Sequence, residues 1–165
     1  MKIIFYGGRT AGMVVLLYLL SKKEHQIKVI PQDTIVENIA RYNNLEIISL
    51  DEVKKEEFNL LITCHGRKKL SDEILHKGPC INLHPCLFKY KGADPIGRYM
   101  LNKDTYASVG CHFMTEKIDD GEFLCEIFFD TPVITSYDEF YNLSYPFYVE
   151  CIHAALILFS WEYQI

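Results

Sequence analysis

The stretch KIIFYGGRTAGMVVLLYLL, residues 2–20, decides the fold. It begins with a short β-branched and aromatic run, Lys2 to Tyr6, which predicts a buried strand. A turn, Gly7-Gly8-Arg9-Thr10, follows, and an apolar segment from about Ala11 to Leu20 then predicts a helix. A strand, a glycine turn and a helix in this order make the first unit of an α/β fold.

The same pattern returns through the first half of the chain. Its apolar runs are short and lack polar alternation, which is typical of parallel strands covered by helices. We therefore expect a Rossmann-like, mostly parallel sheet with helices on both faces. The expected strands are Ile27–Ile30, Leu45–Ser49, Asn59–Cys64 and Pro79–Leu83; the expected helices are Thr34–Tyr42 and Ser71–His76, the second opened by a serine cap; a short acidic turn precedes Asn59.

The second half of the chain has a different pattern. Two strand-like runs, Ser108–Thr115 and Glu122–Phe129, are separated by a turn that contains Asp119-Asp120-Gly121, which predicts an antiparallel C-terminal hairpin. Residues 136–161 predict a long helix that is broken or kinked near Pro146. Because no linker or repeat interrupts the chain, residues 1–165 are expected to form a single domain without a C-terminal accessory domain.

Composition limits the partners and the compartment. The chain has 165 residues and a formal net charge of −5, which disfavours tRNA or another nucleic acid as a partner. The best candidate for a membrane span, Ala11–Leu20, is shorter than the roughly 18 residues required, and the N-terminus does not resemble a signal peptide. We expect a cytoplasmic protein that has no membrane partner. Six cysteines lie in apolar runs without a Cys-x-x-Cys pair, so reduced thiols are expected and a metal is not.

The first candidate binding position is the turn after the first strand. Ligands of open α/β sheets lie beyond the carboxyl ends of the strands. The backbone amides of Gly7 and Gly8 could face a phosphate at the helix N-terminus, with Arg9 nearby. A plain tight turn is the favoured alternative.

Three polar residues are the candidates for chemistry. Asn82 and His84 stand two residues apart at the end of a predicted strand, so their side chains project from the same face. Burying both costs desolvation free energy, so they either satisfy each other or serve a reaction. Asp119 lies in the predicted hairpin turn, where the alternative is an ordinary solvated turn residue.

Four stretches carry a resemblance to a known family. They read INLHPCL (residues 81–87), YKGADPI (90–96), GCHFM (110–114) and IDDG (118–121). Together they resemble the folate-dependent formyltransferases, which include glycinamide ribonucleotide, methionyl-tRNA and sugar N-formyltransferases, and the resemblance runs over most of the chain. It implies that Asn82, His84 and Asp119 are the catalytic trio of a single catalytic domain with the formyltransferase fold.

The resemblance also implies the formyl donor. This is 10-formyltetrahydrofolate, which leaves as tetrahydrofolate, and no metal is involved. The segment Thr63–Leu75 is similar to the part of the family that surrounds the pterin ring. The residues implied in folate binding are Gly66, Leu70, Ile118, Asp120 and Gly121.

The residue types of the trio suit formyl transfer independently of the resemblance. Attack of an amine on the formyl carbon passes through a tetrahedral oxyanion, to which Asn82 and His84 can donate hydrogen bonds. His84 can move a proton near neutral pH, and the carboxylate of Asp119 would favour its imidazolium form and orient its ring. His112, where the family often has histidine, is expected to support the Asp119 loop.

The acceptor amine is the least determined part. Tyr90 to Ile96 are more similar to sugar N-formyltransferases, which act on the amino group of a nucleotide-linked deoxysugar, than to glycinamide ribonucleotide enzymes, which usually have histidines where this chain has Ala93-Asp94-Pro95. Lys91, Asp94 and the Gly7–Arg9 turn are then implied in acceptor binding, although capping of a helix that starts at Pro95 is the safer role for Asp94. A glycinamide ribonucleotide-type or other small-amine enzyme, a non-catalytic folate-binding module and a homodimer stay open.

Overall fold

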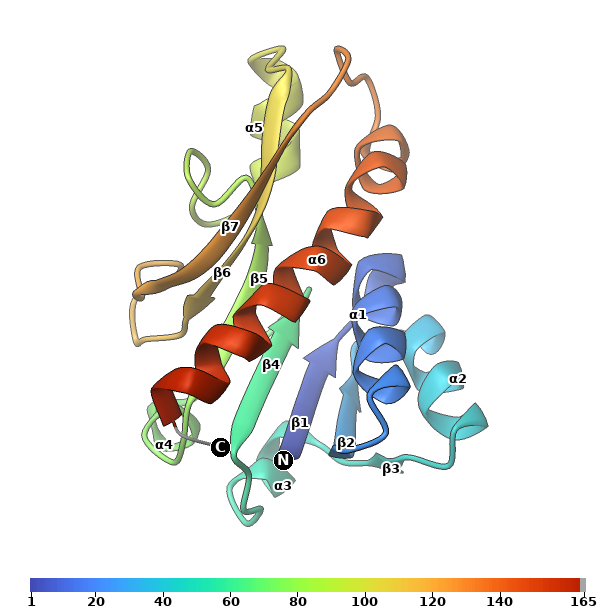
Figure 1. Ribbon diagram of the computed structural model, residues 1–165, viewed down its shortest axis with the longest axis vertical. Helices are drawn as coiled ribbons and strands as arrows, with labels where there is room; N and C mark the ends of the chain where they lie inside the picture. The colour runs from blue at the N-terminus through green and yellow to red at the C-terminus, as the bar shows by residue number, and fades with distance from the viewer. Residues whose placement is uncertain (164–165) are drawn as a thin grey trace. The chain divides into compact units, whose positions relative to one another are not determined.

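The computed structural model describes residues 1–163 and consists of two compact units (Figure 1). The first unit comprises Met1–Asn82 and the second begins at Leu83. The strand β5, Cys80–Pro85, therefore starts in the first unit and ends in the second.

The first unit is built on four parallel strands in the order β3-β2-β1-β4. In strand β1, which pairs with both β2 and β4, Ile3 to Tyr6 are all buried, as expected for a parallel strand whose two faces are both covered. The register sets Ile3 beside Ile27 on one neighbour and Leu60 on the other. The strands are β1 (Lys2–Gly7), β2 (Gln26–Pro31), β3 (Glu46–Ile47) and β4 (Leu60–Cys64).

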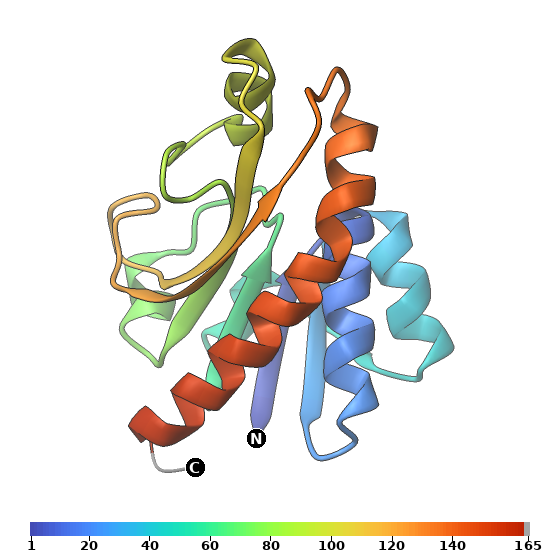
Figure 2. The same ribbon diagram turned by 45° about the horizontal axis from the view of Figure 1, so that its top comes forward.

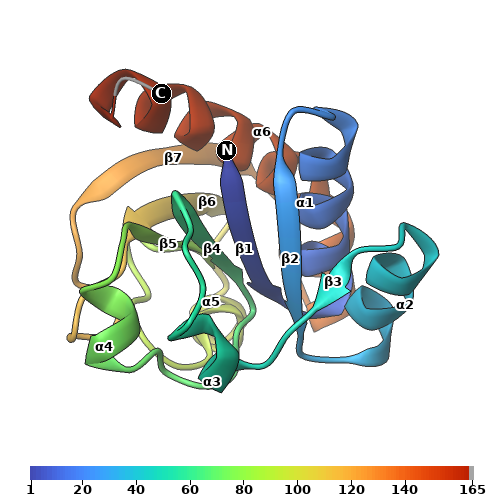
Figure 3. The ribbon, with the colours of Figure 1, turned by 90° about the horizontal axis from the view of Figure 1, so that it is seen from below.

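Two longer helices pack beside this sheet and against each other (Figures 2 and 3). The first, α1, spans Arg9–Ser21 and buries its apolar stripe, including Val15 and Leu19. The second, α2, spans Thr34–Tyr42, and the side chain of Asp33 caps it by accepting a hydrogen bond from the Val36 N–H. The predicted strand–turn–helix start of the fold and the position of α2 are thus confirmed.

The short elements of the first unit differ from the prediction. The expected strand Leu45–Ser49 shrinks to β3, and the expected acidic turn forms a one-turn helix, α3 (Leu50–Val53). The reason is a capping box, in which Ser49 and Glu52 satisfy each other's backbone N–H groups. Helix α4, Asp72–Leu75, follows Ser71 as predicted, but the Ser71 side chain makes no capping hydrogen bond.

The second unit contains the antiparallel pair predicted for the C-terminal half. β6 (Tyr106–Phe113) and β7 (Phe123–Asp130) pair in antiparallel fashion, with an irregularity between Cys111 and His112. The N–H of Cys86, directly after β5, donates to the Ser108 carbonyl of β6 at 2.8 Å. Helix α5 (Pro95–Leu101) lies in the connection between β5 and β6. The mixed sheet class expected from the sequence is therefore confirmed.

The long helix α6, Tyr137–Tyr163, packs along β6 and β7 (Figures 1 and 3). The phenyl rings of Phe129 and Phe147 stack with their centroids 4.0 Å apart, and Phe140 lies edge-on to Tyr99 of α5. The helix continues through Pro146, so a break there is wrong, and a kink at this position stays a prediction.

Helix α6 also has the length and apolar composition of a membrane span, and no other helix among residues 1–163 does. No such segment was expected from the sequence, in which Ala11–Leu20 was the best candidate for a span. The helix meets the criterion for a span through its length and mean hydropathy, and core helices of soluble proteins meet the same criterion. Its buried side includes Tyr148, Ile152 and Phe159. Packing against β6 and β7 thus accounts for part of its apolar character.

Candidate active site

The end of β5 holds His84 in a fixed orientation. Its side chain is 10 % exposed, and its Nδ1 lies 2.8 Å from the carbonyl oxygen of the next residue, Pro85. Asn82 lies two residues earlier on the same strand, so the strand pleat directs both side chains to one face, as predicted. The other ring nitrogen of His84, Nε2, faces Asp119 and Gly92 of the second unit.

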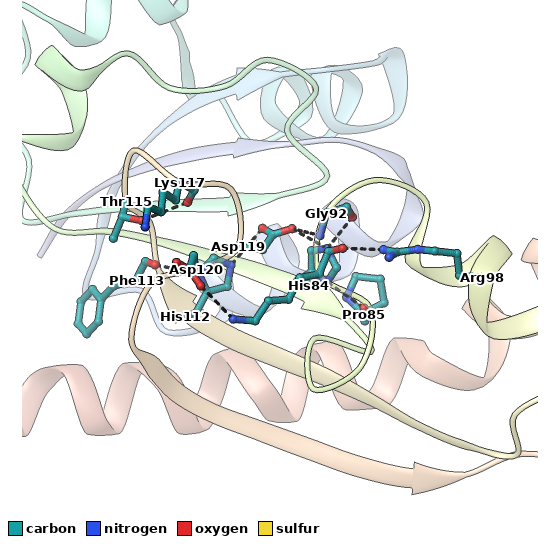
Figure 4. A network of polar contacts seen from close by, with 11 residues as sticks. His84, Pro85, Gly92, Arg98, His112, Phe113, Thr115, Lys117, Asp119 and Asp120 are labelled. Atoms are coloured by element: carbon teal, nitrogen blue, oxygen red, sulfur yellow. Dashed lines mark hydrogen bonds and ion pairs between the residues drawn. The ribbon is translucent and has the colours of Figure 1, made fainter. Parts of the chain in front are cut away.

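Asp119 lies in the connection between β6 and β7 and pairs with His84 (Figure 4). Its Oδ2 is 3.0 Å from His84 Nε2, and the Asp119 side chain is also only 10 % exposed. The backbone of Asp119 has a φ of 51°, the left-handed region, which aspartate tolerates better than most residues. The structure therefore brings together two of the three residues from which the sequence predicted chemistry.

Two further groups hold the Asp119 carboxylate. The Gly92 N–H donates to Oδ2 at 2.8 Å, and His112 Nε2 lies 3.4 Å from Oδ1. His112 Nδ1 is itself 2.8 Å from the Phe113 carbonyl, so both histidine rings are oriented by the carbonyl of the following residue. The expected contact between His112 and the Asp119 loop is confirmed.

These contacts determine the charge of Asp119. Burial alone would raise the pKa of its carboxyl group. Hydrogen bonds from His112 and His84, the charge of His84 and the Gly92 N–H outweigh burial and hold the pKa of Asp119 well below its usual range. The carboxylate is therefore ionised at neutral pH and can stabilise a positive charge on His84.

Gly92, in the stretch YKGADPI, is a site residue for which no role was predicted from the sequence. Its carbonyl oxygen lies 3.3 Å from His84 Nε2, so Gly92 contacts both members of the pair. Its φ is 82°, a conformation that glycine adopts readily. The available signal was the Lys-Gly pair in YKGADPI, but only the folded loop reveals its direction.

The other residues proposed for the second unit lie around this core. Lys91 Nζ pairs with Asp120 Oδ1 at 3.3 Å on the surface. Asp94 caps α5 by accepting from the Gly97 N–H at 3.1 Å, and it also accepts a hydrogen bond from the Tyr137 hydroxyl. The capping role of Asp94 is thus the one its contacts support. Ile118 is 66 % exposed, so the turn carries an accessible apolar side chain.

Gly121 fixes the path of that turn. A Cβ atom at this position would lie 1.7 Å from the carbonyl oxygen of Phe113, at the end of β6. No other residue type fits without moving the backbone, so glycine lets the turn return closely over the strand. The turn that carries Asp119 is therefore anchored at its far end.

In the first unit, the turn after β1 is occupied by a side chain of the protein itself. The Arg9 N–H donates to Asp33 Oδ2, and the Gly8 N–H donates to the Cys64 carbonyl at 3.1 Å. The carboxylate of Asp33 thus lies where a phosphate could have been bound according to the sequence. The favoured alternative of a tight turn describes these contacts, and anion binding by Gly7, Gly8 and Arg9 stays a prediction.

The segment expected near the pterin ring is also held within the first unit. The Lys68 N–H donates to the Tyr6 hydroxyl at 2.8 Å, and the Arg67 N–H donates to Gln32 Oε1 at 3.2 Å. Leu70 is buried, with 1 % of its surface exposed, whereas Gly66 lies just before the anchored residues. Their role in folate binding stays a prediction.

None of the six cysteines forms a disulfide, and five of them are buried. Burial raises the pKa of the Cys80 and Cys86 thiols to about 12, so neither is a reactive thiolate at neutral pH. No cluster of three or more histidine, cysteine or acidic side chains suited to a metal occurs within residues 1–163.

Known structures share this architecture. A phosphoribosylglycinamide formyltransferase from Campylobacter jejuni superposes with a TM-score of 0.77 at 20% identity, covering 95% of this chain and 96% of its own. An N-formyltransferase from Helicobacter canadensis superposes with a TM-score of 0.80 at 19% identity, covering 94% and 64% of the two chains. At these identities the likeness establishes the fold.

Sequence comparison identifies the family. The methionyl-tRNA formyltransferase of Helicobacter acinonychis is 26% identical over 151 residues, which cover 75% of this chain and 49% of the relative. The chain thus spans about half the length of the curated relatives it matches. The model of the formyl transferase family matches residues 30–139, which is more than half of the chain and includes His84, His112 and Asp119. The chain therefore belongs to the formyl transferase family, as its sequence motifs predicted.

Proposed function

We propose that the protein transfers a formyl group from 10-formyltetrahydrofolate to the primary amine of a nucleotide-linked amino-deoxysugar. The observation that carries the proposal is the buried pair of His84 and Asp119, 3.0 Å apart, at the end of β5 in a chain of the formyl transferase family. A carboxylate-oriented imidazole beside a strand end is suited to acid–base chemistry on a bound substrate.

Asn82 and His84 stabilise the charge that develops during the reaction. When the amine attacks the formyl carbon, the carbonyl oxygen becomes an oxyanion. The proposed donors to it are the side-chain amide of Asn82 and an N–H of the His84 ring, two residues apart on β5. By analogy with other oxyanion holes, each donor would lower the barrier by roughly 3 kcal/mol.

His84 also transfers the proton. The attacking amine must lose a proton and the departing folate nitrogen must gain one, and an imidazole can do both near neutral pH. Asp119, ionised because its pKa is depressed, stabilises the imidazolium that forms in between. Holding the amine next to the formyl carbon would supply much of the remaining rate.

Structural relatives support folate as the donor. The Helicobacter canadensis N-formyltransferase was solved with folinic acid, and the HypX protein of Aquifex aeolicus with tetrahydrofolic acid. In this chain the exposed Ile118, with Asp120 and Gly121 in the same turn, and separately the Gly66–Leu70 segment of the first unit are the proposed folate contacts.

The nucleotide-sugar acceptor is the finer part of the proposal. It is supported by the same Helicobacter canadensis protein, whose complex contains dTDP-3-aminofucose, and by the Lys91-Gly92-Ala93-Asp94 sequence. Lys91 is the basic residue proposed to meet an anionic part of the acceptor. The net charge of −5 argues against tRNA. We further propose that a single catalytic domain, acting in the cytoplasm and able to form a homodimer, performs the reaction.

An assay with several acceptors tests the proposal. Purified protein and 10-formyltetrahydrofolate are mixed with a dTDP-linked amino sugar, glycinamide ribonucleotide or methionyl-tRNA, and tetrahydrofolate release is followed. We expect release with the amino sugar, and none with His84→Ala. Release with glycinamide ribonucleotide or methionyl-tRNA alone would contradict the acceptor. Folate binding without turnover on any amine would contradict catalysis and indicate a binding module.

A further inference from the structure

Arg98 lies on α5, one turn after the cap residue Asp94, and its guanidinium group extends back toward the loop after β5 (Figure 4). Its Nη2 donates to the carbonyl oxygen of Lys91 at 2.7 Å, and its Nε donates to the carbonyl of Asp94 at 3.4 Å. The guanidinium also lies over the Tyr90 ring, 5.4 Å from its centroid. Two backbone carbonyls and the Tyr90 ring thus fix the position of the Arg98 guanidinium.

The carbonyl of Lys91 and the N–H of Gly92 belong to one peptide group. A peptide group is planar, so its C=O and N–H point in opposite directions and turn together. Arg98 binds the oxygen of this peptide, and the Asp119 carboxylate accepts from its N–H at 2.8 Å. Fixing one end of the plane therefore fixes the other.

Gly92 makes such an anchor necessary. A Cβ at this position would meet no atom within 4 Å, so space does not require glycine; the φ of 82° does. Glycine has access to many backbone conformations, and the Lys91–Gly92 peptide can rotate unless something holds it. A charged donor on the carbonyl also polarises the peptide and strengthens its N–H as a donor.

We propose that Arg98 is a positioning residue for formyl transfer, acting through the Lys91–Gly92 peptide on Asp119 and His84. It touches neither side chain. It holds the peptide so that the Gly92 N–H meets Asp119 Oδ2, the oxygen that lies 3.0 Å from His84 Nε2. This inference rests on the proposed function for its kinetic consequences but not for its structural ones.

Kinetics of Arg98 variants provide the first test. Arg98→Ala is expected to lower kcat on the order of a hundredfold, the effect of a misplaced catalytic group, with little change in the KM for folate. Guanidinium chloride at millimolar concentration should restore part of the lost rate. Arg98→Lys should be intermediate, because an ammonium lacks the planar fork that reaches both carbonyls. The matched control is Arg41→Ala, since the Arg41 side chain is exposed and pairs with Glu37 within α2.

A wild-type kcat in Arg98→Ala, or a loss that appears only as a raised KM and resists guanidinium, would overturn the proposal. If Arg98→Ala does not fold, Arg98→Lys carries the same test, because it keeps the aliphatic stem.

Nuclear magnetic resonance of the Gly92 amide separates this proposal from the proposed function. Hydrogen exchange of that amide should accelerate at least about tenfold in Arg98→Ala relative to Arg41→Ala, because the unanchored peptide can turn its N–H away from Asp119. If the wild-type protein transfers no formyl group but the Gly92 amide responds in this way, the positioning role stands and the proposed function fails. If the amide does not respond, the positioning role fails whatever the activity.

Discussion

Asp119 distributes its two oxygens among three donors. Oδ2 faces His84 and the Gly92 N–H, whereas Oδ1 faces His112. A carboxylate held on both oxygens cannot rotate away from the imidazole, which is what a residue that orients a proton carrier requires. Its left-handed backbone is a further cost that the surrounding contacts offset.

The first prediction concerns the two members of this pair. His84→Ala removes the proton carrier, and Asp119→Asn keeps the shape of the side chain but removes the charge. Each should lower kcat at least about a hundredfold in the formyl-transfer assay, with an unchanged circular dichroism spectrum. Asp51→Asn, an exposed acid on α3, serves as the control and should retain the wild-type rate. Near wild-type turnover in either site variant would disprove the assignment.

At the scale of elements, the sequence predicted what local patterns encode. Buried β-branched runs predicted β1 and β4. Helix α2 has the predicted bounds, Thr34–Tyr42. The extent of β3 and the formation of α3 were missed, because a capping box competes with strand pairing over a few residues. Continuity of α6 through Pro146 was missed because packing on β6 and β7 overrides the local penalty of proline.

The candidate site was likewise predictable only where a local sequence pattern encodes it. His84 and Asp119 carry recognisable spacing and residue type, so a sequence motif could name them. Gly92 acts through its backbone N–H, and the Arg98 guanidinium binds backbone carbonyls, and contacts of this kind leave no residue-specific signal in one sequence. Their role follows from where the loop between β5 and α5 returns, which is a tertiary property.

The turn between β6 and β7 gives the second prediction. Gly121→Ala would place a methyl group 1.7 Å from the Phe113 carbonyl oxygen, so the backbone that carries Asp119 must shift. We expect lower kcat together with a loss of about 1–3 kcal/mol in the free energy of unfolding, measured by urea denaturation. The matched control is Gly78→Ala, whose nearest atom belongs to the movable Phe58 ring at 3.0 Å. Equal effects of both substitutions on kcat would argue against a strained Asp119 turn.

At the scale of the whole molecule, the depressed pKa of Asp119 couples the stability of the fold to pH. In the unfolded chain, the carboxyl group of Asp119 has the ordinary pKa of an aspartate, about 3.9. Because the folded pKa is lower, the unfolded state binds more protons as the pH falls through that value. The stabilisation from Asp119 is therefore fully present above about pH 5 and is lost progressively below it.

The third prediction follows from this coupling. Asp119→Asn should be less stable than the wild type at pH 7, and the difference in the free energy of unfolding should shrink as the pH falls below about 4, where the unfolded carboxyl is protonated. Urea denaturation at a series of pH values measures both. Asp51→Asn, at an exposed position of α3, removes the same charge and serves as the control for net charge. A stability difference that does not change between pH 7 and pH 3 would mean that Asp119 stabilises the fold through its shape and not through its charge.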